Sequence, residues 1–142
     1  MASKSLPRGL RNCNPGNIRR SKVRYRGEVA GGRDPEFREF ESIALGYRAM
    51  FVLLHTYRLK HHCCTLREMI SRYAPPSENN TEGYIARVAR QSGVKPEEPI
   101  DTLDRATMVA IVCAMSAVEN GVAAKVEEVE GGWREFIADF GK

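Results

Sequence analysis

Apolar residues recur at helical spacing along most of the chain after residue 42, and this pattern predicts a mainly helical protein. The stretch from residue 106 to residue 118 is apolar nearly all round, which is typical of a helix buried at the centre of a domain. The expected helices cover residues 43–60, residues 65–73, a segment around Tyr84 that ends at Gly93, residues 106–118 and residues 126–139.

Residues that favour helix ends stand at the borders of these segments. Ser42 is expected to cap the first helix, because its hydroxyl can accept a bond from an unpaired backbone N–H. Thr65, with Glu68 three residues later, has the spacing of a capping box. Two prolines end the second helix after Ala74, and Gly121 suits the end of the apolar one.

The segment from residue 22 to residue 40 has a different pattern. It alternates loosely and contains several glycines, which predicts two short strands in a β-hairpin. The expected fold class is therefore mainly α (α+β), with a small N-terminal β-hairpin. A chain of 142 residues is expected to form one domain over residues 1–142, with residues 1–7 as a disordered arm.

Ahead of this segment, residues 8–20 contain arginines, asparagines and almost no core material. Asn14-Pro15-Gly16-Asn17 is a predicted turn: proline fixes one φ, Gly16 permits a positive φ, and the asparagine amides can bond the local backbone. Two interpretations stay open: a binding surface held by a scaffold, or a basic arm that contains one good turn.

Charge is distributed unevenly along the chain. Residues 1–60 carry 13 Lys and Arg against 5 Asp and Glu, whereas residues 99–142 carry 4 against 8. The basic half could attract nucleic acid, an anionic cell-wall polymer or the acidic half of the same chain. Because no helix-turn-helix, zinc-finger or RNA-binding motif accompanies the charge, a nucleic-acid partner is not favoured.

The cysteines and the apolar runs restrict the chemistry further. Cys13, Cys63, Cys64 and Cys113 do not have zinc-site spacing and are expected to be free thiols, with no metal and no cofactor. The neighbouring residues 61–62, both histidine, suit a solvated helix end. No apolar run is long enough for a bilayer and no Sec signal peptide is visible, so we expect no membrane partner and cytoplasmic synthesis.

Five motifs together resemble phage and prophage proteins of the Bacteroidetes type that are labelled virion structural proteins. This resemblance covers nearly the whole chain. The motifs are RGLRNCNPGNIR at residues 8–19, DPEFREFES at residues 34–42, GYRA at residues 46–49, YAPPSENNT at residues 73–81 and YI at residues 84–85.

A more distant resemblance is to lysozyme-like murein hydrolases, in particular the glucosaminidases of glycoside hydrolase family 73, and to lytic transglycosylases. The Asn-Leu-Phe-Gly-Ile-Lys turn of family 73 is similar to residues 14–19, and its Phe-Arg-x-Tyr-x-Ser motif is similar to residues 37–42. A loose counterpart of its Tyr-Ala-x-x-x-x-Tyr motif is found at Tyr73-Ala74 and Tyr84. The resemblance implies a lysozyme-like helical domain that acts on peptidoglycan.

In those families the catalytic glutamate ends a helix that precedes the turn, whereas this chain has no glutamate ahead of Leu10. Residues 110–121 (AIVCAMSAVENG) resemble that catalytic helix but follow the turn in the sequence. A circular permutation would place Glu119 over the cleft. A carboxyl at the end of an apolar helix is desolvated, which raises its pKa and suits a proton donor. The alternative is an exposed acid near a helix C-terminus.

A glycosidase that hydrolyses its substrate uses a second carboxylate. Glu28, Asp34 and Glu36 are the candidates, and Glu28 is favoured because family 73 enzymes carry their second acid in the β-lobe. Asp34 is also a common turn-initiating residue in front of proline. A lytic transglycosylase needs no second acid, because a hydroxyl of the sugar itself attacks.

Sugar binding favours amides, arginines and aromatic faces. Trp133 is expected in the core rather than on a sugar platform, and Tyr73 fits either place. The candidate substrate-binding residues are Asn14, Asn17, Arg19, Tyr25, Tyr73, Glu78 and Asn79, with Asn80 beside them.

The expected function is therefore cleavage of peptidoglycan glycan strands by a phage or prophage endolysin or virion-associated enzyme, acting as a muramidase, glucosaminidase or lytic transglycosylase. The alternative is a non-catalytic virion structural or cell-wall-binding protein with the same fold, which could contact other virion proteins. A basic nucleic-acid-binding protein is a third hypothesis, and it predicts steeply salt-dependent DNA binding.

Overall fold

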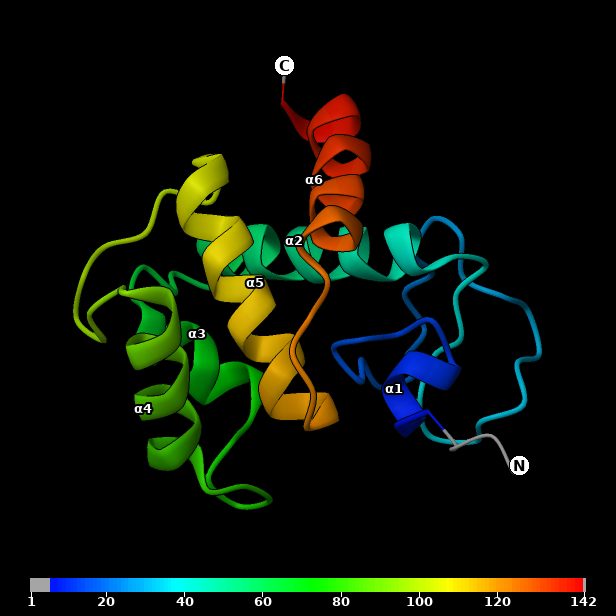
Figure 1. Cartoon of the computed structure of the whole chain (residues 1–142), viewed down its shortest axis with the longest axis horizontal. Coiled ribbons are helices and arrows are strands. Elements are labelled where there is room, and N and C mark those ends of the chain that lie inside the picture. Colours follow the sequence, from blue (N-terminus) through cyan, green and yellow to red (C-terminus); the bar gives the residue numbers. More distant parts are fainter. Residues whose placement is uncertain (1–5, 142) are drawn as a thin grey trace.

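A computed structural model describes residues 6–141 of the protein. The part of the expected disordered arm that covers residues 1–5 lies outside the described residues. Figure 1 shows that α2 runs through the middle of the molecule, with α6 packed across it and the N-terminal loops at one end. The helices in residues 6–141 are α1 (Arg8–Arg11), α2 (Ile43–Lys60), α3 (Leu66–Tyr73), α4 (Thr81–Ser92), α5 (Arg105–Asn120) and α6 (Val126–Phe140).

The predicted mainly helical class is confirmed, and the five long helices lie where the apolar pattern places them. The short α1 was not expected, because four residues are too few to show a helical period. Ser42 accepts a hydrogen bond from the backbone N–H of Leu45, and Thr65 and Glu68 form the predicted capping box. Gly121 ends α5 in the left-handed conformation.

The largest interface between helices joins α2 and α6. Phe51 of α2 contacts two aromatic rings of α6, Trp133 at a centroid distance of 5.1 Å and Phe136 at 5.9 Å. Trp133 is therefore a core residue, as predicted. The apolar α5 is buried against α4 and α6, and α1 packs against it near its C-terminal end. These contacts fix where the N-terminal loops meet the helices.

The predicted β-hairpin is wrong. Within residues 19–40 the structure has isolated antiparallel bridges, Arg19 with Phe37 and Glu28 with Phe40, and no continuous strand. Arginine side chains take the place of ladder partners: buried Arg38 donates to the carbonyls of Arg19 and Val23, at 3.0 and 2.6 Å. These guanidinium bonds satisfy two backbone carbonyls of the segment, which folds as an ordered loop.

The acidic C-terminal half neutralises part of the basic N-terminal half. Arg26 pairs with Glu135 at 2.6 Å and with Asp139 at 2.8 Å, and Arg48 also reaches Asp139 at 3.0 Å. All four cysteines are free thiols. No helix within residues 6–141 has the length and apolar character needed to cross a membrane.

Candidate functional site

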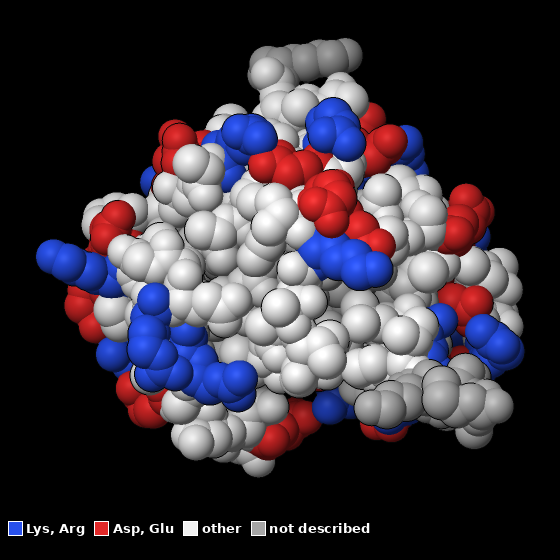
Figure 2. All heavy atoms as spheres, in the orientation of Figure 1, with Lys and Arg blue, Asp and Glu red and all other residues white. Residues whose placement is uncertain are grey.

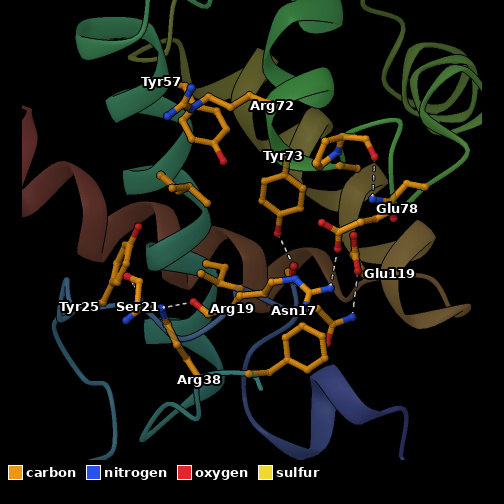
Figure 3. A pocket seen from close by; sticks show the side chains of 17 residues that line it. Asn17, Arg19, Ser21, Tyr25, Arg38, Tyr57, Arg72, Tyr73, Glu78 and Glu119 are labelled. Atoms are coloured by element: carbon orange, nitrogen blue, oxygen red, sulfur yellow. Dashed lines mark hydrogen bonds and ion pairs between the residues drawn. The ribbon is translucent and has the colours of Figure 1, made fainter. Parts of the chain in front are cut away.

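A cavity of about 440 Å³ lies where the N-terminal loop meets α2, α3 and α5 (Figure 3). Its walls combine amides, arginines, tyrosines and carboxylates, which are the groups that bind polar ligands. The residues that line it are Gly16, Asn17, Ile18, Arg19, Ser21, Tyr25, Phe37, Arg38, Leu53, Tyr57, Arg72, Tyr73, Ala74, Pro75, Glu78, Asn79 and Glu119.

The predicted turn forms one wall of this cavity. The backbone N–H of Asn17 donates to the carbonyl of Asn14 at 2.9 Å, which closes the turn. The Asn14 amide is fully buried, donates to the carbonyls of Ile18 and Arg38, and accepts from the N–H of Ile18. Asn14 was predicted to bind substrate, but its side chain is engaged within the loop and does not line the cavity.

The positive φ in this turn falls on Asn17, at 49°, and not on Gly16 as the sequence suggested. Gly16 is needed for a different reason. A Cβ at Gly16 would meet the Tyr73 hydroxyl and would lie 2.8 Å from Cγ of Met50. The Tyr73 hydroxyl donates to the Gly16 carbonyl, so α3 and the turn touch directly at the back of the cavity.

Glu119 lies at the C-terminal end of α5 and faces the cavity, with both carboxylate oxygens bonded (Figure 3). The amide Nδ2 of Asn17 donates to Oε1 at 2.9 Å, and the Tyr84 hydroxyl on α4 donates to Oε2 at 2.9 Å. Two helices and the N-terminal turn thus meet at one carboxyl. The structure brings together Glu119 and Asn17, which the sequence separates by 102 residues.

Burial raises the pKa of Glu119 above its usual value. The hydrogen bonds from Asn17 and Tyr84 and the charge of Arg19 act in the opposite direction, because each favours the anion, but burial is the largest effect. Burial also holds the pKa of Tyr84 well above its usual value, so this hydroxyl keeps its proton at neutral pH. The arrangement suits a carboxyl group that donates and accepts a proton.

Arg19 forms the rim of the cavity beside Glu119. Its guanidinium pairs with Glu78 at 3.1 Å and with Glu36 at 3.4 Å, and it lies 5.3 Å from the centre of the Phe37 ring. Asn79 lies next to Glu78 and donates to the carbonyl of residue 75 at 3.2 Å. The predicted binding residues Arg19, Glu78 and Asn79 therefore share one exposed edge of the cavity.

Two of the three candidates for a second acid, Glu28 and Asp34, do not line the cavity. Glu28 is paired with the buried guanidinium of Arg38, which also stacks 4.6 Å from the ring centre of Tyr25. Tyr25 itself does line the cavity.

Asp34 is bound to Arg8 at 2.6 Å and accepts further bonds from Asn12 and from two backbone N–H groups. The Arg8 guanidinium and these donors hold the pKa of Asp34 well below its usual range. Asp34 organises the loop that carries it. Glu36, the remaining candidate, pairs with Arg8 and Arg19 on the surface.

Sequence reasoning missed Tyr84 as a site residue, although the YI motif was noticed. Tyr84 has an apolar neighbour at Ile85 and helical spacing to Val88, a pattern that predicts only a helix. Its hydroxyl reaches Glu119 only because α4 and α5 pack together, which no local pattern shows. Tyr57 and Arg72 also line the cavity and had no sequence signal beyond helical position.

These features describe a mainly helical protein with a polar, carboxylate-containing cavity between an N-terminal loop and a helical core. No known protein-family model matches the chain. Over 117 residues, the chain is 38% identical to Protein P5 of Pseudoalteromonas phage PM2, and the match covers 80% of this chain and 71% of that protein. The chain belongs to the family of this phage protein.

Proposed function

We propose that the protein cleaves the glycan strands of peptidoglycan, with Glu119 as the proton donor to the leaving glycosidic oxygen. The observation that carries this proposal is the position of Glu119, a desolvated carboxyl with a raised pKa that faces a polar cavity. The chain belongs to a phage protein family, and the proposal assigns it a role at the host cell wall during infection.

The donors around Glu119 support the same role. Asn17 and Tyr84 each bond one carboxylate oxygen, so the group is held in one orientation relative to the cavity. After the proton has passed to the leaving oxygen, the same two donors stabilise the anion that remains. Asn17, Arg19, Tyr25, Tyr73, Glu78 and Asn79 lie where they could contact the sugar units.

Lytic transglycosylation is the form of the reaction that the geometry favours. Glu28 and Asp34 are engaged with arginines away from the cavity lining, and Glu78 is paired with Arg19 at the rim. With one desolvated acid among the lining residues, the sugar's own hydroxyl is the simplest nucleophile. Glu119 would accept its proton as a base and would deliver a proton to the leaving oxygen as an acid.

The test is release of soluble muropeptides from purified peptidoglycan, analysed by mass spectrometry. We expect anhydro fragments from the natural protein and loss of release by at least a hundredfold in Glu119→Gln, because the amide cannot donate a proton in this way. Glu127→Gln is the matched control, since Glu127 is an exposed acid at the start of α6. Reducing-end fragments would indicate hydrolysis, and equal release by Glu119→Gln would contradict the role of this residue.

A second candidate function is that of a virion structural or wall-binding protein without catalysis. The face in Figure 2 has a largely uncharged centre, over which the connection between α5 and α6 passes in Figure 1. Val122 on this connection is 49% exposed, and Val126 is 54% exposed. Such apolar exposure favours contact with another protein. No muropeptide release, together with sedimentation of the protein with peptidoglycan or with virions, would support this alternative.

A further inference from the structure

Arg72 lines the cavity but differs from the other arginines of the site. Arg19 is paired with glutamates at the rim of the cavity, and Arg38, in the floor of the cavity, is paired with a glutamate. No carboxylate of residues 6–141 lies within ion-pair distance of Arg72. The cavity therefore contains one guanidinium whose charge is not matched by an acid in the described part of the chain.

The contacts of Arg72 hold it in place without neutralising it. Its guanidinium lies 5.3 Å from the centre of the Tyr57 ring, within the range of a cation–π contact. One nitrogen lies 3.3 Å from Nε2 of His61, and an imidazole nitrogen that accepts a bond supplies no negative charge. The stacking keeps the planar fork oriented, which lowers the entropy lost when it binds an anion.

Arg72 and Glu119 mark different ends of the cavity. In Figure 3, Arg72 and Tyr57 lie at one end, Tyr73 lies between, and Glu119 with Asn17 lies at the other end. The Tyr57 hydroxyl points into the same space as a second polar group. A ligand that reaches from Glu119 to Arg72 would thus place a sugar linkage at one end and an anionic group at the other.

We propose that Arg72 is a carboxylate-binding subsite that selects anionic glycan, an inference that rests on the proposed function. In peptidoglycan a carboxylate can come from two sources. Muramic acid without a peptide has a free carboxylate on its lactyl group. Where a stem peptide is attached, the lactyl carboxyl forms an amide bond, and the stem peptide supplies a carboxylate of its own. A planar guanidinium pairs with either of them through two parallel hydrogen bonds. Neutral oligomers of N-acetylglucosamine have no such group.

The experiment measures binding by calorimetry in the Glu119→Gln background, so that no ligand is consumed. Three tetrasaccharides are compared: an N-acetylglucosamine oligomer, a peptide-free strand with muramic acid, and the same strand with stem peptides. We expect at least one strand with muramic acid to bind about fivefold more tightly than the neutral oligomer, the range of a partly exposed ion pair. The carboxylated ligand that shows the preference identifies the source of the carboxylate.

Adding Arg72→Gln is expected to remove this preference and to leave the affinity for the neutral oligomer unchanged. Arg90→Gln is the matched control, because Arg90 is exposed on α4 and does not line the cavity. Equal binding of all three ligands, or a preference that survives Arg72→Gln, would overturn the subsite while muropeptide release by the natural protein still supported cleavage. Binding of none of the ligands would overturn the subsite and count against the proposed function as well.

Discussion

Gly46, in the first turn of α2, lies where the helical core and the N-terminal turn approach each other closely. A Cβ at this position would meet the carbonyl oxygen of Cys13, and it would lie 2.8 Å from Cδ of Pro15 and 2.9 Å from the carbonyl carbon of Cys13. Two of these three atoms are backbone, so no side-chain rotation can relieve the contact. Gly46→Ala must push the turn that carries Asn17 away from α2.

The size of the effect follows from these distances. Carbon atoms in proteins are normally separated by about 3.5–4.0 Å, so the turn must move by roughly 1 Å. Overpacking of this kind costs about 1–3 kcal/mol of the free energy of unfolding. Alanine is the better helix former by up to about 1 kcal/mol, which offsets part of that cost. We expect Gly46→Ala to lower the free energy of unfolding by about 1–2 kcal/mol.

Urea unfolding followed by circular dichroism at 222 nm measures this change. Gly131→Ala is the matched control, because Gly131 is helical in α6 and a Cβ there would have its nearest contact at 3.7 Å. That variant should be more stable than the natural protein by about 0.5–1 kcal/mol. If Gly46→Ala proves as stable as Gly131→Ala, the close approach between α2 and the turn is wrong.

Two further predictions concern the surroundings of Glu119. Because burial raises the pKa of Glu119 in the folded protein above its usual 4.5, this residue destabilises the fold as the pH rises from 4.5 through the folded pKa. The stability of Glu119→Gln relative to the natural protein should therefore increase between pH 4 and pH 8, by about 1.4 kcal/mol for each unit by which the pKa of Glu119 is raised. Thermal melts of both proteins over this pH range measure the difference. If the difference does not change with pH, the burial of this charge is wrong. A Cβ at Gly9 would lie 2.8 Å from Oδ1 of Asn17 and 2.6 Å from Oδ1 of Asn120, so Gly9→Ala should displace the Asn17 amide from Glu119. Muropeptide release should then fall about tenfold while far-ultraviolet circular dichroism stays unchanged, and undiminished release would show that Asn17 does not position the acid.

The helices could be predicted from sequence because each carries its own periodic pattern and its own end residues. The capping box at Thr65 and Glu68 is a local interaction between residues three apart, so the sequence contains all the information that it needs. Local patterns could not show that the expected β-hairpin does not form. In that segment the side chain of Arg38 folds inward and bonds the carbonyls of Arg19 and Val23, which lie 19 and 15 residues away in the sequence. An arginine in a loosely alternating segment is ordinarily assigned to the solvent side.

The candidate site likewise combines features that are visible in the local sequence with features that depend on tertiary packing. Asn14 and Asn17 have the same residue type in the same turn, yet one amide bonds the loop itself and the other reaches Glu119. The two asparagines also differ in backbone conformation, because Asn17 has a left-handed φ and Asn14 does not. Tyr84 contributes its hydroxyl only because α4 lies against α5. Residue types therefore indicated candidate chemistry, whereas tertiary packing decided which candidates meet.

Glu119 combines two influences that act in the same direction. Burial disfavours its anion, and the carbonyl end of α5 adds partial negative charge close by, which disfavours the anion again. The donors that orient it come from Asn17, near the beginning of the chain, and from Tyr84, in its middle. Such a site depends on where the elements pack and not on their order in the sequence. Glu119, late in the chain, therefore faces the same cavity as the turn that carries Asn17, and the circular-permutation hypothesis stays a prediction.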